Sequence, residues 1–499
     1  MSLALVYSRA LSGMNAPLVE VEAHLANGLP AFNIVGLPDT EVKESRDRVR
    51  AAIIQSGFDF PAKKITVNLA PADLPKESGR FDLPIAIGIL AASGQVSLEK
   101  LADYEFAGEL ALSGLLRPVR GALAMAWQGA QAGRAFVLPH ENAGQAAVMK
   151  GIRAFGADSL GAVAAHLNAV EPLAQAVCAV ADRPSESAPL PDLRDVKGQH
   201  TARLALEIAA AGGHSLLMMG PPGTGKSMLS QRLPGILPPL TEEELVEVWA
   251  LRSLLPGHAQ QAMDAKRPFR SPHHSASSAA MVGGGSDPRP GEISLAHHGV
   301  LFLDELPEFD RKVLEVLREP LENGEIHISR AARQVVYPAK FQLVAAMNPC
   351  PCGYLGHPVK PCRCTAESIA RYRSKISGPL LDRIDLTIEV PGLPAAELMQ
   401  QQEGESSAAV LQRVLAARER QYARQGKVNA ALGAAELDDT ARIDPQAREA
   451  LGAMLEKLSL SARSFHRILR VARTLADLAG DEAVGRSHVL KAVSFRRAL

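Results

Sequence analysis

Apolar and polar positions follow two different periodicities in the first part of the chain. They alternate over residues 3–7, 18–23 and 64–69, as in half-buried strands, and they recur at helical spacing over residues 39–56 and 84–92. Strands and helices that follow one another in this way are typical of a compact α/β domain. The pattern therefore predicts an α/β domain at the start of the chain.

The pattern changes twice further along. Residues 171–191 are rich in Pro, Ser and Ala, which predicts a linker after a first domain at residues 1–170. Between residues 192 and 392, short continuous apolar runs lie between helical segments, which predicts a second α/β domain with a parallel sheet. Residues 393–499 have a helical pattern apart from a looser stretch at residues 425–444, so we expect a helical C-terminal domain.

Composition excludes few functions. With 499 residues the chain is long enough for several domains. Its 54 basic and 54 acidic side chains balance, so any nucleic-acid site must come from local patches. No segment has the pattern of a signal peptide, and every apolar stretch is shorter than the roughly 18 residues of a membrane span. We therefore expect a soluble, cytoplasmic protein without a membrane segment.

A glycine-rich loop connects the apolar run at residues 216–219 to the helical segment after it. The loop fits the phosphate-binding pattern G-x-x-x-x-G-K-[ST] with the residues Gly220, Pro221, Pro222, Gly223, Thr224, Gly225, Lys226 and Ser227. Its glycines allow backbone N–H groups to turn toward a phosphate, its lysine reaches the β- and γ-phosphates, and its hydroxyl binds Mg²⁺. The loop therefore predicts a site for ATP and Mg²⁺.

A second apolar run, at residues 299–303, ends in the adjacent carboxylates Asp304 and Glu305. A buried parallel strand that ends in this way presents one carboxylate to the Mg²⁺ shell and the next to the water that attacks the γ-phosphate. We assign the first role to Asp304 and the second to Glu305. The alternative is a solvated acidic strand end, against which the upstream phosphate-binding loop argues.

Four of the five cysteines form two C-x-C pairs, Cys350 with Cys352 and Cys362 with Cys364. Four thiolates can complete a tetrahedral Zn²⁺ site, and the Gly- and Pro-rich loop between the pairs has little core of its own. The alternatives are free cysteines or a redox pair, and His357 is a spare candidate ligand. The sequence therefore predicts zinc at this loop.

Two pairs of adjacent histidines, at residues 273–274 and 297–298, also raise the question of a metal. Adjacent side chains point to opposite faces of a strand, so we do not expect either pair to bind a metal ion.

The phosphate-binding loop and the Asp-Glu strand resemble those of AAA+ ATPases. The resemblance implies that Val196 and Gln199 flank the adenine base. It also implies that Asn348, at the end of the apolar run 341–347, occupies the sensor-1 position, from which its amide orients the attacking water or contacts the γ-phosphate.

The same resemblance assigns two arginines. Arg383 resembles the arginine finger that reaches the γ-phosphate bound to a neighbouring subunit, and an ion pair with Asp382 or Asp385 is the alternative. Arg463, on a helix with a basic face, resembles the sensor-2 arginine, with Arg467 as the second candidate. Whether this arginine serves its own subunit's nucleotide or a neighbour's stays open.

Two insertions narrow the resemblance to the AAA+ branch that contains magnesium chelatase and the MCM helicases. Residues 269–292 are loop-like and glycine-rich, and residues 325–337 show two alternating runs around a turn, which predicts a hairpin. In rings of this branch both elements point into the pore, where Arg330 and Arg333 would contact DNA phosphates. The alternative is an exposed basic turn without a partner.

The first domain resembles Lon-type protease domains over residues 68–142. The resemblance places Asp82 where that family has its nucleophilic serine and Leu123 near its catalytic lysine. A Ser–Lys dyad needs a hydroxyl and an amine, so we expect a protease-like domain without protease activity.

Over nearly its whole length the chain resembles the magnesium chelatase-like family of ComM (YifB). The resemblance implies an ATP-dependent homo-hexameric helicase that acts on single-stranded and branched DNA and promotes branch migration during natural transformation. One alternative is a magnesium chelatase motor subunit, against which we count the protease-like domain. The other is a nucleotide-gated scaffold that does not translocate DNA.

Overall fold

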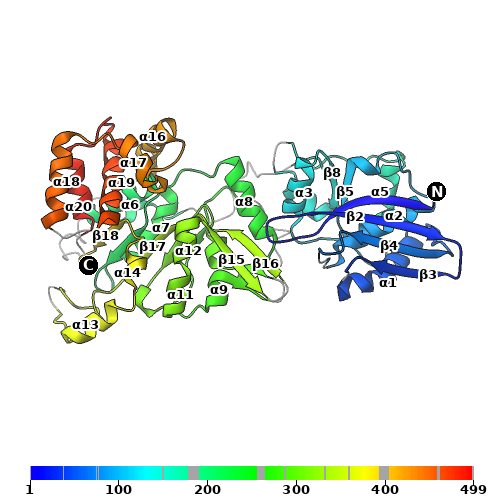
Figure 1. The fold of residues 1–499 in the computed structure, drawn as a ribbon, viewed down its shortest axis with the longest axis horizontal. Coiled ribbons are helices and arrows are strands. Elements are labelled where there is room, and N and C mark those ends of the chain that lie inside the picture. Colours follow the sequence, from blue (N-terminus) through cyan, green and yellow to red (C-terminus); the bar gives the residue numbers. More distant parts are fainter. Residues whose placement is uncertain are drawn as a thin grey trace. The chain divides into compact units, whose positions relative to one another are not determined.

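The computed structural model describes residues 2–37, 39–74, 76, 78–148, 151–177, 190–255, 264–285, 288–330, 333–357, 360–392, 404–457 and 461–496. Figure 1 shows the elements of the chain in sequence colours. Two compact units account for it. Unit 1 comprises Met1–Ser187, Thr241–Ala265 and Ala331–Val336, and unit 2 comprises Ala188–Leu240, Lys266–Arg330 and Tyr337–Leu499.

Unit 1 is built on a seven-stranded mixed sheet with the strand order β3-β4-β2-β1-β5-β8-β9. Its strands are β1 (Leu3–Arg9), β2 (Leu18–Ala26), β3 (Ala31–Val35), β4 (Lys64–Ala70), β5 (Tyr104–Phe106), β8 (Ala135–Pro139) and β9 (Ala154–Ala157). β6 (Glu109–Leu110) and β7 (Leu116–Arg117) form a separate pair. The three alternating runs of the sequence are β1, β2 and β4, and every second side chain along β2 and β4 is buried.

The helices of unit 1 are α1 (Thr40–Gln55), α2 (Asp82–Ala92), α3 (Ala122–Gln131), α4 (His140–Ala146) and α5 (Leu160–Leu167). Asp39 caps the start of α1, because its side chain accepts a hydrogen bond from the backbone N–H of Val42 at 2.8 Å. All residues of α2 are buried, which agrees with its nearly continuous apolar sequence.

α8 (Glu242–Ser253) belongs to unit 1, although its sequence lies in the region that we assigned to the second domain. Thr241 and Glu244 form a capping box at its start. The apolar side of α8 buries Trp249 and Ala250 in a cluster with Leu123 of α3. The alanine-rich surface of α3 therefore provides the apolar face that a helix with a buried Trp requires.

Unit 2 contains a five-stranded, wholly parallel sheet with the order β11-β14-β17-β10-β18. The strands are β10 (Leu216–Met219), β11 (Phe269–Arg270), β14 (Val300–Leu303), β17 (Gln342–Met347) and β18 (Leu386–Glu389). All side chains of β10 and β14 are buried, as expected for strands that are covered on both faces. The parallel sheet predicted from the sequence is thus confirmed.

Shorter elements connect these strands. The helices are α6 (His200–Gly212), α7 (Lys226–Arg232), α9 (Ser278–Val282), α10 (Glu292–Leu295), α11 (Arg311–Val316), α12 (Arg318–Asn323), α13 (Ala366–Arg373) and α14 (Gly378–Leu381). The first insertion is more ordered than the loop we expected, because it contains α9 and the strand pair β12 (Gly283–Gly284) and β13 (Arg289–Pro290). β15 (Glu325–Arg330) and β16 (Arg333–Pro338) form the predicted two-stranded sheet.

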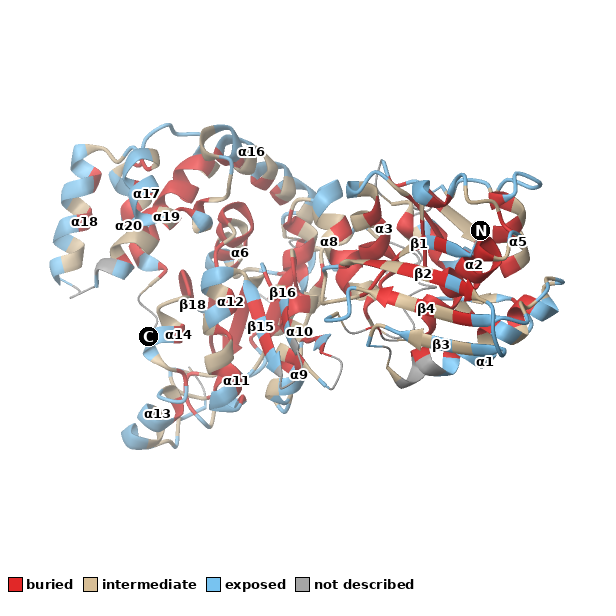
Figure 2. Cartoon of the chain, turned by 45° about the vertical axis from the view of Figure 1, so that its right-hand side comes forward, coloured by how far each residue is buried: buried red, intermediate tan, exposed pale blue. Residues whose placement is uncertain are grey.

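The C-terminal region is helical, as predicted, with α16 (Ser407–Gln425), α17 (Ala434–Thr440), α18 (Pro445–Lys457), α19 (Ala462–Ala479) and α20 (Arg486–Ser494). The stretch at residues 425–444, which we expected to be loose, contains α17. Side chains of α16, α19 and α20 share one apolar core with α6 and the parallel sheet. Figure 2 shows the buried strands of both sheets and the exposed outer face of α18.

Among the described residues, no helix combines the length and apolar character that a membrane span needs.

Candidate nucleotide site and cysteine cluster

Three neighbouring strands of the parallel sheet end in the residues that the sequence singled out. β10 leads into the phosphate-binding loop, β14 into Asp304 and Glu305, and β17 into Asn348. β17 pairs with β14 on one side and β10 on the other, with Met219 opposite Met347 and Leu303 opposite Ala345. Because all three strands are parallel, their carboxyl ends lie at one edge of the sheet, where ligands bind in folds of this kind.

The phosphate-binding loop is held by its own lysine. Lys226 Nζ donates hydrogen bonds to the carbonyl oxygens of Gly220 and Pro221 at 2.8 and 2.9 Å, and it lies 3.4 Å from Oδ1 of Asn348. Burial lowers the pKa of Lys226, while the charges of Asp304 and Glu305 oppose that change. The lysine therefore sits among carbonyl dipoles and carboxylates that a phosphate can replace as its partner.

Glycine is required at three positions of this loop. Gly223 and Gly225 have φ angles of 79° and 85°, a left-handed conformation that other residues rarely adopt. A Cβ atom on Gly220 would lie 2.2 Å from the carbonyl oxygen of Val390. The sequence pattern therefore reflects both backbone conformation and a close approach of two chain segments. Pro221, Pro222 and Thr224 complete the loop, and the Thr224 hydroxyl donates to the Pro221 carbonyl at 3.0 Å.

Ser227 and Asp304 meet as expected for two groups that share a cation. The Ser227 hydroxyl donates to Oδ2 of Asp304 at 2.5 Å, and Oδ1 of Asp304 accepts the backbone N–H of Glu305 at 2.9 Å. Mg²⁺ prefers oxygen ligands, and this pair supplies a hydroxyl and a carboxylate beside the phosphate-binding loop. The donor set therefore fits Mg²⁺.

Glu305 differs from Asp304 in its surroundings. Its φ angle is 53°, its side chain is 52% exposed, and its Oε2 lies 3.2 Å from Nδ1 of His274. We expected adjacent histidines to point apart, but the rings of His273 and His274 lie 4.1 Å apart, and those of His297 and His298 lie 3.9 Å apart. The expectation was wrong because neither pair belongs to a strand.

The two residues predicted beside the base lie before α6. Val196 is buried. Gln199 has a φ angle of 49°, and its side chain donates to the carbonyl of Thr224 at 2.7 Å. This hydrogen bond joins the segment before α6 to the phosphate-binding loop, which agrees with a shared role in holding a nucleotide.

Asn348 is half-buried and follows β17 directly. The phenol of Tyr372 on α13 lies against it, and burial raises the pKa of Tyr372 to about 12 although the backbone N–H of Asn348 opposes that rise. Tyr372 was not identified from the sequence. Its position shows that the helix after the cysteine loop packs beside the predicted water-orienting amide.

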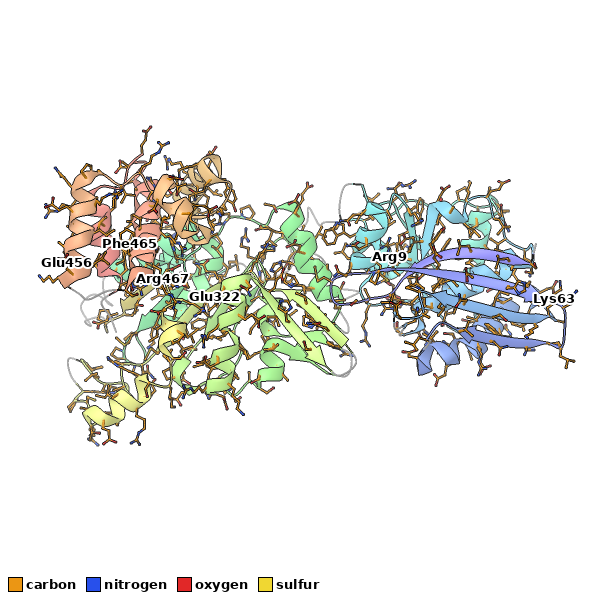
Figure 3. All side chains as sticks on the ribbon, in the orientation of Figure 1. Arg9, Lys63, Glu322, Glu456, Phe465 and Arg467 are labelled. Carbon is orange, nitrogen blue, oxygen red and sulfur yellow. The ribbon has the colours of Figure 1, made fainter. Side chains whose placement is uncertain are left out.

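Arg383 has a partner within its own chain. Its guanidinium pairs with Glu322 of α12 and donates to the carbonyl of Pro379 at 2.6 Å, and its side chain is 13% exposed. Figure 3 labels Glu322. The ion pair that we considered as the alternative involved Asp382 or Asp385, so the structure gives Arg383 a different acidic partner. Because Glu322 is itself largely exposed, this contact lies at the surface.

The two sensor-2 candidates have different environments. Arg463, in the first turn of α19, is 77% exposed and lies 4.0 Å from Asp382. Arg467, one turn further and labelled in Figure 3, is largely buried and lies 3.3 Å from Asp385. Burial lowers the pKa of Arg467. Arg463 is thus the arginine that can reach outward, and Arg467 anchors α19 to the residue before β18.

Arg330 and Arg333 stand at the facing ends of β15 and β16. Their side chains lie outside the part of the chain that the structure describes, as do residues 331–332 between them. The prediction of DNA contacts at these arginines stays a prediction.

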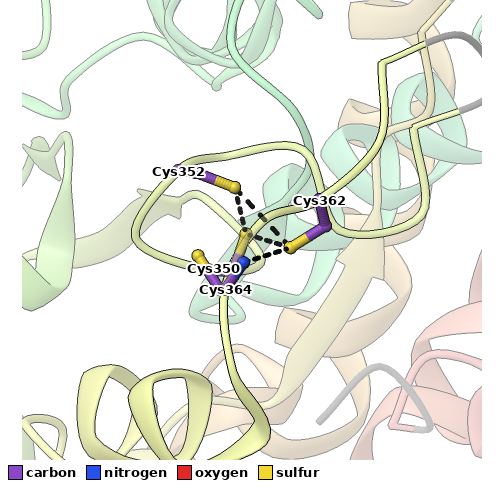
Figure 4. A group of neighbouring side chains, drawn as sticks. All are labelled: Cys350, Cys352, Cys362 and Cys364. Atoms are coloured by element: carbon purple, nitrogen blue, oxygen red, sulfur yellow. Dashed lines mark hydrogen bonds between the residues drawn. The ribbon is translucent and has the colours of Figure 1, made fainter.

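The four cysteines come together as predicted (Figure 4). Their sulfur atoms all lie within 4.8 Å of one another, and the Sγ–Sγ distances are 3.4 Å for Cys350–Cys352, 3.7 Å for Cys350–Cys362 and 3.6 Å for Cys352–Cys362. Four sulfurs bound at about 2.3 Å to a tetrahedral Zn²⁺ stand about 3.8 Å apart. The donor set and its spacing therefore fit zinc.

The backbone of this loop favours a thiolate at Cys352, whereas the neighbouring sulfurs raise the pKa of Cys362 to about 12 although the backbone N–H of Cys364 opposes that rise. Backbone N–H groups of Tyr354 and Arg363 donate to the sulfur of Cys352 and lower its pKa to about 6. The backbone N–H of Cys364 points at Sγ of Cys362 at 3.4 Å. His357, the spare candidate ligand, instead accepts the backbone N–H of Lys360 at its Nδ1.

In unit 1, the positions that the protease resemblance singled out are both buried. Asp82 accepts hydrogen bonds from the Ser45 hydroxyl, from Nε of Arg48 at 2.8 Å and from the backbone N–H of Leu110 at 3.2 Å. Leu123 is buried on α3. Neither side chain is placed to act on an external substrate.

No motif or periodicity predicted the contact between His274 and Glu305 or that between Arg383 and Glu322. Each joins residues at least 31 positions apart through loops or helix ends rather than through a ladder. The pairing of β11 with β14 brings the segment that carries His274 beside the strand that ends in Asp304 and Glu305.

Comparison with known proteins covers the chain almost completely. Residues 192–398 match the family described as magnesium chelatase, subunit ChlI, and residues 404–496 match its C-terminal family. Residues 21–142 match the family described as subunit ChlI of Mg-chelatase. The first domain therefore does not set this chain apart from proteins described as chelatase subunits, contrary to our expectation.

Full-length relatives agree with these matches. Uncharacterized protein YifB of Salmonella typhimurium is 52% identical over 99% of this chain and 97% of its own length. Competence protein ComM of Haemophilus influenzae is 49% identical over 99% of this chain and 98% of its own length. Uncharacterized protein Rv2897c of Mycobacterium tuberculosis is 43% identical over 100% of this chain and 99% of its own length. The chain therefore belongs to the ComM/YifB family of magnesium chelatase-like AAA+ proteins.

Proposed function

We propose that this protein is a DNA translocase that hydrolyses ATP and promotes branch migration. The observation that carries the ATPase part is the meeting of Lys226, the Ser227–Asp304 pair and Asn348 at the carboxyl ends of three adjacent parallel strands. This arrangement combines a phosphate ligand, a Mg²⁺ site and a water-orienting amide within one edge of a sheet.

The chain's residues divide the chemistry among them. Lys226 exchanges its carbonyl partners for the β- and γ-phosphates, and Ser227 and Asp304 hold the cation. Mg²⁺, when bound, neutralises charge on the phosphates. Glu305 accepts the proton of the attacking water, and Asn348 fixes the position of that water. ATP and water then give ADP and inorganic phosphate.

In a ring of subunits, arginine side chains supply further positive charge at the γ-phosphate. We propose that Arg383 contacts the γ-phosphate bound to a neighbouring subunit, which requires its guanidinium to leave Glu322. Arg463, with its exposed side chain at the start of α19, is assigned to a γ-phosphate contact that reports the nucleotide state. Both assignments need subunit contacts, so the active form is proposed to be a homo-hexamer that assembles on nucleotide or DNA.

DNA is the proposed substrate because the Haemophilus influenzae relative is called a competence protein. Two elements of the ATPase core suit contact with a nucleic-acid backbone. One is the hairpin of β15 and β16, which carries Arg330 and Arg333. The other is the glycine segment Gly283–Gly285, in which all three φ angles are positive. Single-stranded and branched DNA are the structures that a branch-migrating motor engages.

Zinc is proposed as a structural cofactor of the loop between β17 and α13. The support is the four-sulfur cluster and the N–H groups directed at Cys352. Bound there, Zn²⁺ would hold the loop that leads from Asn348 to Tyr372, and so would brace the amide proposed to orient water.

The experiment that tests the proposal measures ATP turnover with no DNA, with single-stranded DNA and with a four-way junction, together with migration of that junction. Lys226→Ala should weaken nucleotide binding, whereas Glu305→Gln should bind ATP normally and lose about 10²- to 10⁴-fold in kcat. Turnover that DNA does not stimulate, with unmoved junctions, would favour the scaffold. Mg²⁺ insertion into a porphyrin would favour the chelatase alternative.

A further inference from the structure

The segment from Cys350 to Lys375, which comprises the cysteine loop and α13, is basic in a chain whose charges balance overall. It contains five lysine or arginine side chains, at positions 360, 363, 371, 373 and 375, and one carboxylate, Glu367. A centre of four thiolates and one Zn²⁺ contributes two net negative charges, so the segment keeps a net positive charge with zinc bound. In a chain without net charge, a polyanion can be held only by a local patch of this kind.

Three of these cations face solvent and have weak partners or none. Lys360, Arg363 and Arg371 are exposed. Lys360 and Arg363 form no ion pair with any described residue. Arg371 pairs with Glu367 at 2.8 Å, but the two side chains are 78% and 81% exposed, and such pairs contribute little. Each of the three cations can therefore exchange water or a weak partner for a phosphate.

The cysteine cluster positions two of the cations. Arg363 lies between two cysteines of the cluster, and its backbone N–H donates to the sulfur of Cys352, as does the backbone N–H of Tyr354. The Lys360 ammonium lies 5.2 Å from the centre of the Tyr354 ring, which holds it by a cation–π contact. Lys360 and Arg363 are thus carried by one framework that the four sulfurs close.

The same loop packs on the nucleotide site. Gly353 is buried, and a Cβ atom at this position would lie 2.7 Å from both Cγ and Cδ of Pro222 in the phosphate-binding loop and 3.8 Å from Cγ of Asn348. The backbone of the cysteine loop therefore lies directly against two segments that we propose to bind ATP. A shift of the phosphate-binding loop on nucleotide exchange would be passed through Gly353 to the cations.

The chemistry of this surface favours a nucleic-acid backbone over a protein partner. Among the described residues of the segment, no large apolar side chain is exposed. The cores of protein interfaces are rich in aromatic side chains and depleted of lysine, whereas Lys and Arg are common ligands of DNA phosphates. α13 lies at the edge of unit 2 in Figures 1 and 2, and Tyr372 is its only buried residue. A strand of DNA can therefore reach these side chains.

We propose that Lys360, Arg363 and Arg371 form a binding site for the phosphates of single-stranded DNA, and that the contact between Gly353 and Pro222 makes its affinity depend on the bound nucleotide. The site is distinct from the two insertions of the ATPase core. The inference rests on the proposed function, because it takes DNA as the substrate of the motor.

The test measures binding of a fluorescent oligothymidylate to the full chain at several salt concentrations, with a non-hydrolysable ATP analogue and with ADP. Lys360→Ala with Arg363→Ala should lower the slope of log affinity against log salt by about 1.4, which is roughly 25-fold in affinity at about 0.1 M salt. The difference in affinity between the two nucleotides should shrink in the same variant. Arg371→Ala should lower the slope by about 0.7.

Two further pairs separate phosphate contacts from other effects. Lys360→Arg with Arg363→Lys keeps both charges and should bind like the parent. Lys63→Ala with Lys64→Ala removes the same charge from exposed positions of unit 1 and should leave the slope unchanged. If the alanine pair in the cysteine loop also changes the zinc content, Lys360→Ala alone, two positions before the nearest cysteine, should still lower the slope by about 0.7.

A parental slope after removal of the loop cations overturns the inference, and so does an equal loss in the Lys63 and Lys64 pair. A loop variant that no longer assembles with nucleotide also overturns it, because the surface would then be a contact between copies of the chain. Equal affinities with both nucleotides in the parent overturn the nucleotide dependence.

The site and the proposed function fail in different ways. If DNA neither binds to the parent nor stimulates its ATP turnover, the two fail together. If DNA stimulates the parent and the loop variant keeps the parental slope, only the site fails.

Discussion

Each unit contains a carboxylate at a position where the families it resembles have a catalytic residue, and the two carboxylates have opposite environments. Asp82 of unit 1 is buried, with hydrogen bonds from Ser45, Arg48 and a backbone N–H group. Glu305 of unit 2 is half-exposed and held by one imidazole. Burial raises the pKa of Asp82, and its hydrogen bonds to Arg48 and Ser45 oppose that rise.

The difference shows which groups of an α/β domain stabilise the fold and which can bind a substrate. A group whose hydrogen bonds are all made inside the fold cannot exchange them for a substrate without leaving buried partners unpaired. A group that is partly exposed and has one weak partner can exchange that partner for a substrate. The comparison therefore predicts which polar clusters stabilise the fold, which act on substrates and which need an external partner.

The cysteine cluster is the clearest case of a group that needs an external partner. Metal analysis should find about one zinc per chain, since structural zinc sites contribute roughly 10–16 kcal/mol of apparent binding free energy in zinc-finger peptides. Cys352→Ser together with Cys364→Ser should abolish the zinc content, while Cys178→Ser, a cysteine outside the cluster and outside the described residues, should retain it. Anaerobically purified protein without zinc, and with all four thiols open to alkylation, would exclude the site.

The environment of Arg383 alone does not decide whether this residue is structural or catalytic. Its side chain is 13% exposed, as for a structural residue, but its partner Glu322 is largely exposed. Arg383→Ala should lower kcat by about 10³-fold or more with little change in ATP affinity, as the loss of an arginine finger does. Glu322→Ala, which removes only the partner, should turn over ATP at close to the parental rate.

Mixed rings then distinguish the two roles of Arg383. Arg383→Ala subunits supply an intact Glu305, and Glu305→Gln subunits supply an intact arginine, so mixtures should recover activity above that of either variant. If no mixture recovers activity and Arg383→Ala lowers the unfolding temperature instead, Arg383 belongs with Asp82 among the structural groups.

Asp82→Asn should show the opposite behaviour. It removes the charge that pairs with Arg48, which costs about 3 kcal/mol, the low end for a buried pair because Arg48 retains some solvent contact. That corresponds to a fall of roughly 6–12 °C in the unfolding temperature of unit 1 by calorimetry. ATP turnover below that transition should be unchanged. Asp103→Asn, the same substitution at an exposed position of the same unit, should leave the transition in place.

The parts of the molecule that could be predicted from sequence are those fixed by local pattern and by strand order. The runs that became β10, β14 and β17 are short and apolar and lead directly into the phosphate-binding loop, the Asp-Glu pair and Asn348, so parallel pairing brings Lys226, Asp304 and Asn348 together. The four cysteines were found in the same way, because the loop that separates the two pairs is short enough to close on itself.

The contacts that could not be predicted depend on loop conformation. His274 reaches Glu305 from a turn that His273 and Ser275 form, and the rule that adjacent side chains point apart holds in a strand but not in such a turn. Arg383 and Glu322 lie 61 positions apart and meet through two short helices. The packing of α8 on α3 could not be predicted either, because its capping box and apolar face identify a helix but not the surface on which that helix packs.

The smallest expected effect concerns DNA and extends the comparison to Arg330 and Arg333. If both side chains contact phosphates, replacing them with Ala should reduce the salt dependence of DNA binding by about two counterions, at any sequence, with basal ATP turnover unchanged. DNA stimulation and junction migration should fall together with the salt dependence.

The exposed cations Arg486 and Lys491 of α20 provide the matched control, since Arg486→Ala with Lys491→Ala removes the same charge from the C-terminal helices. Equal losses in both double variants would indicate a general charge effect. A parental salt slope in the hairpin variant would remove these arginines from the mechanism and leave Gly283–Gly285 as the remaining candidate for DNA contact within the two insertions.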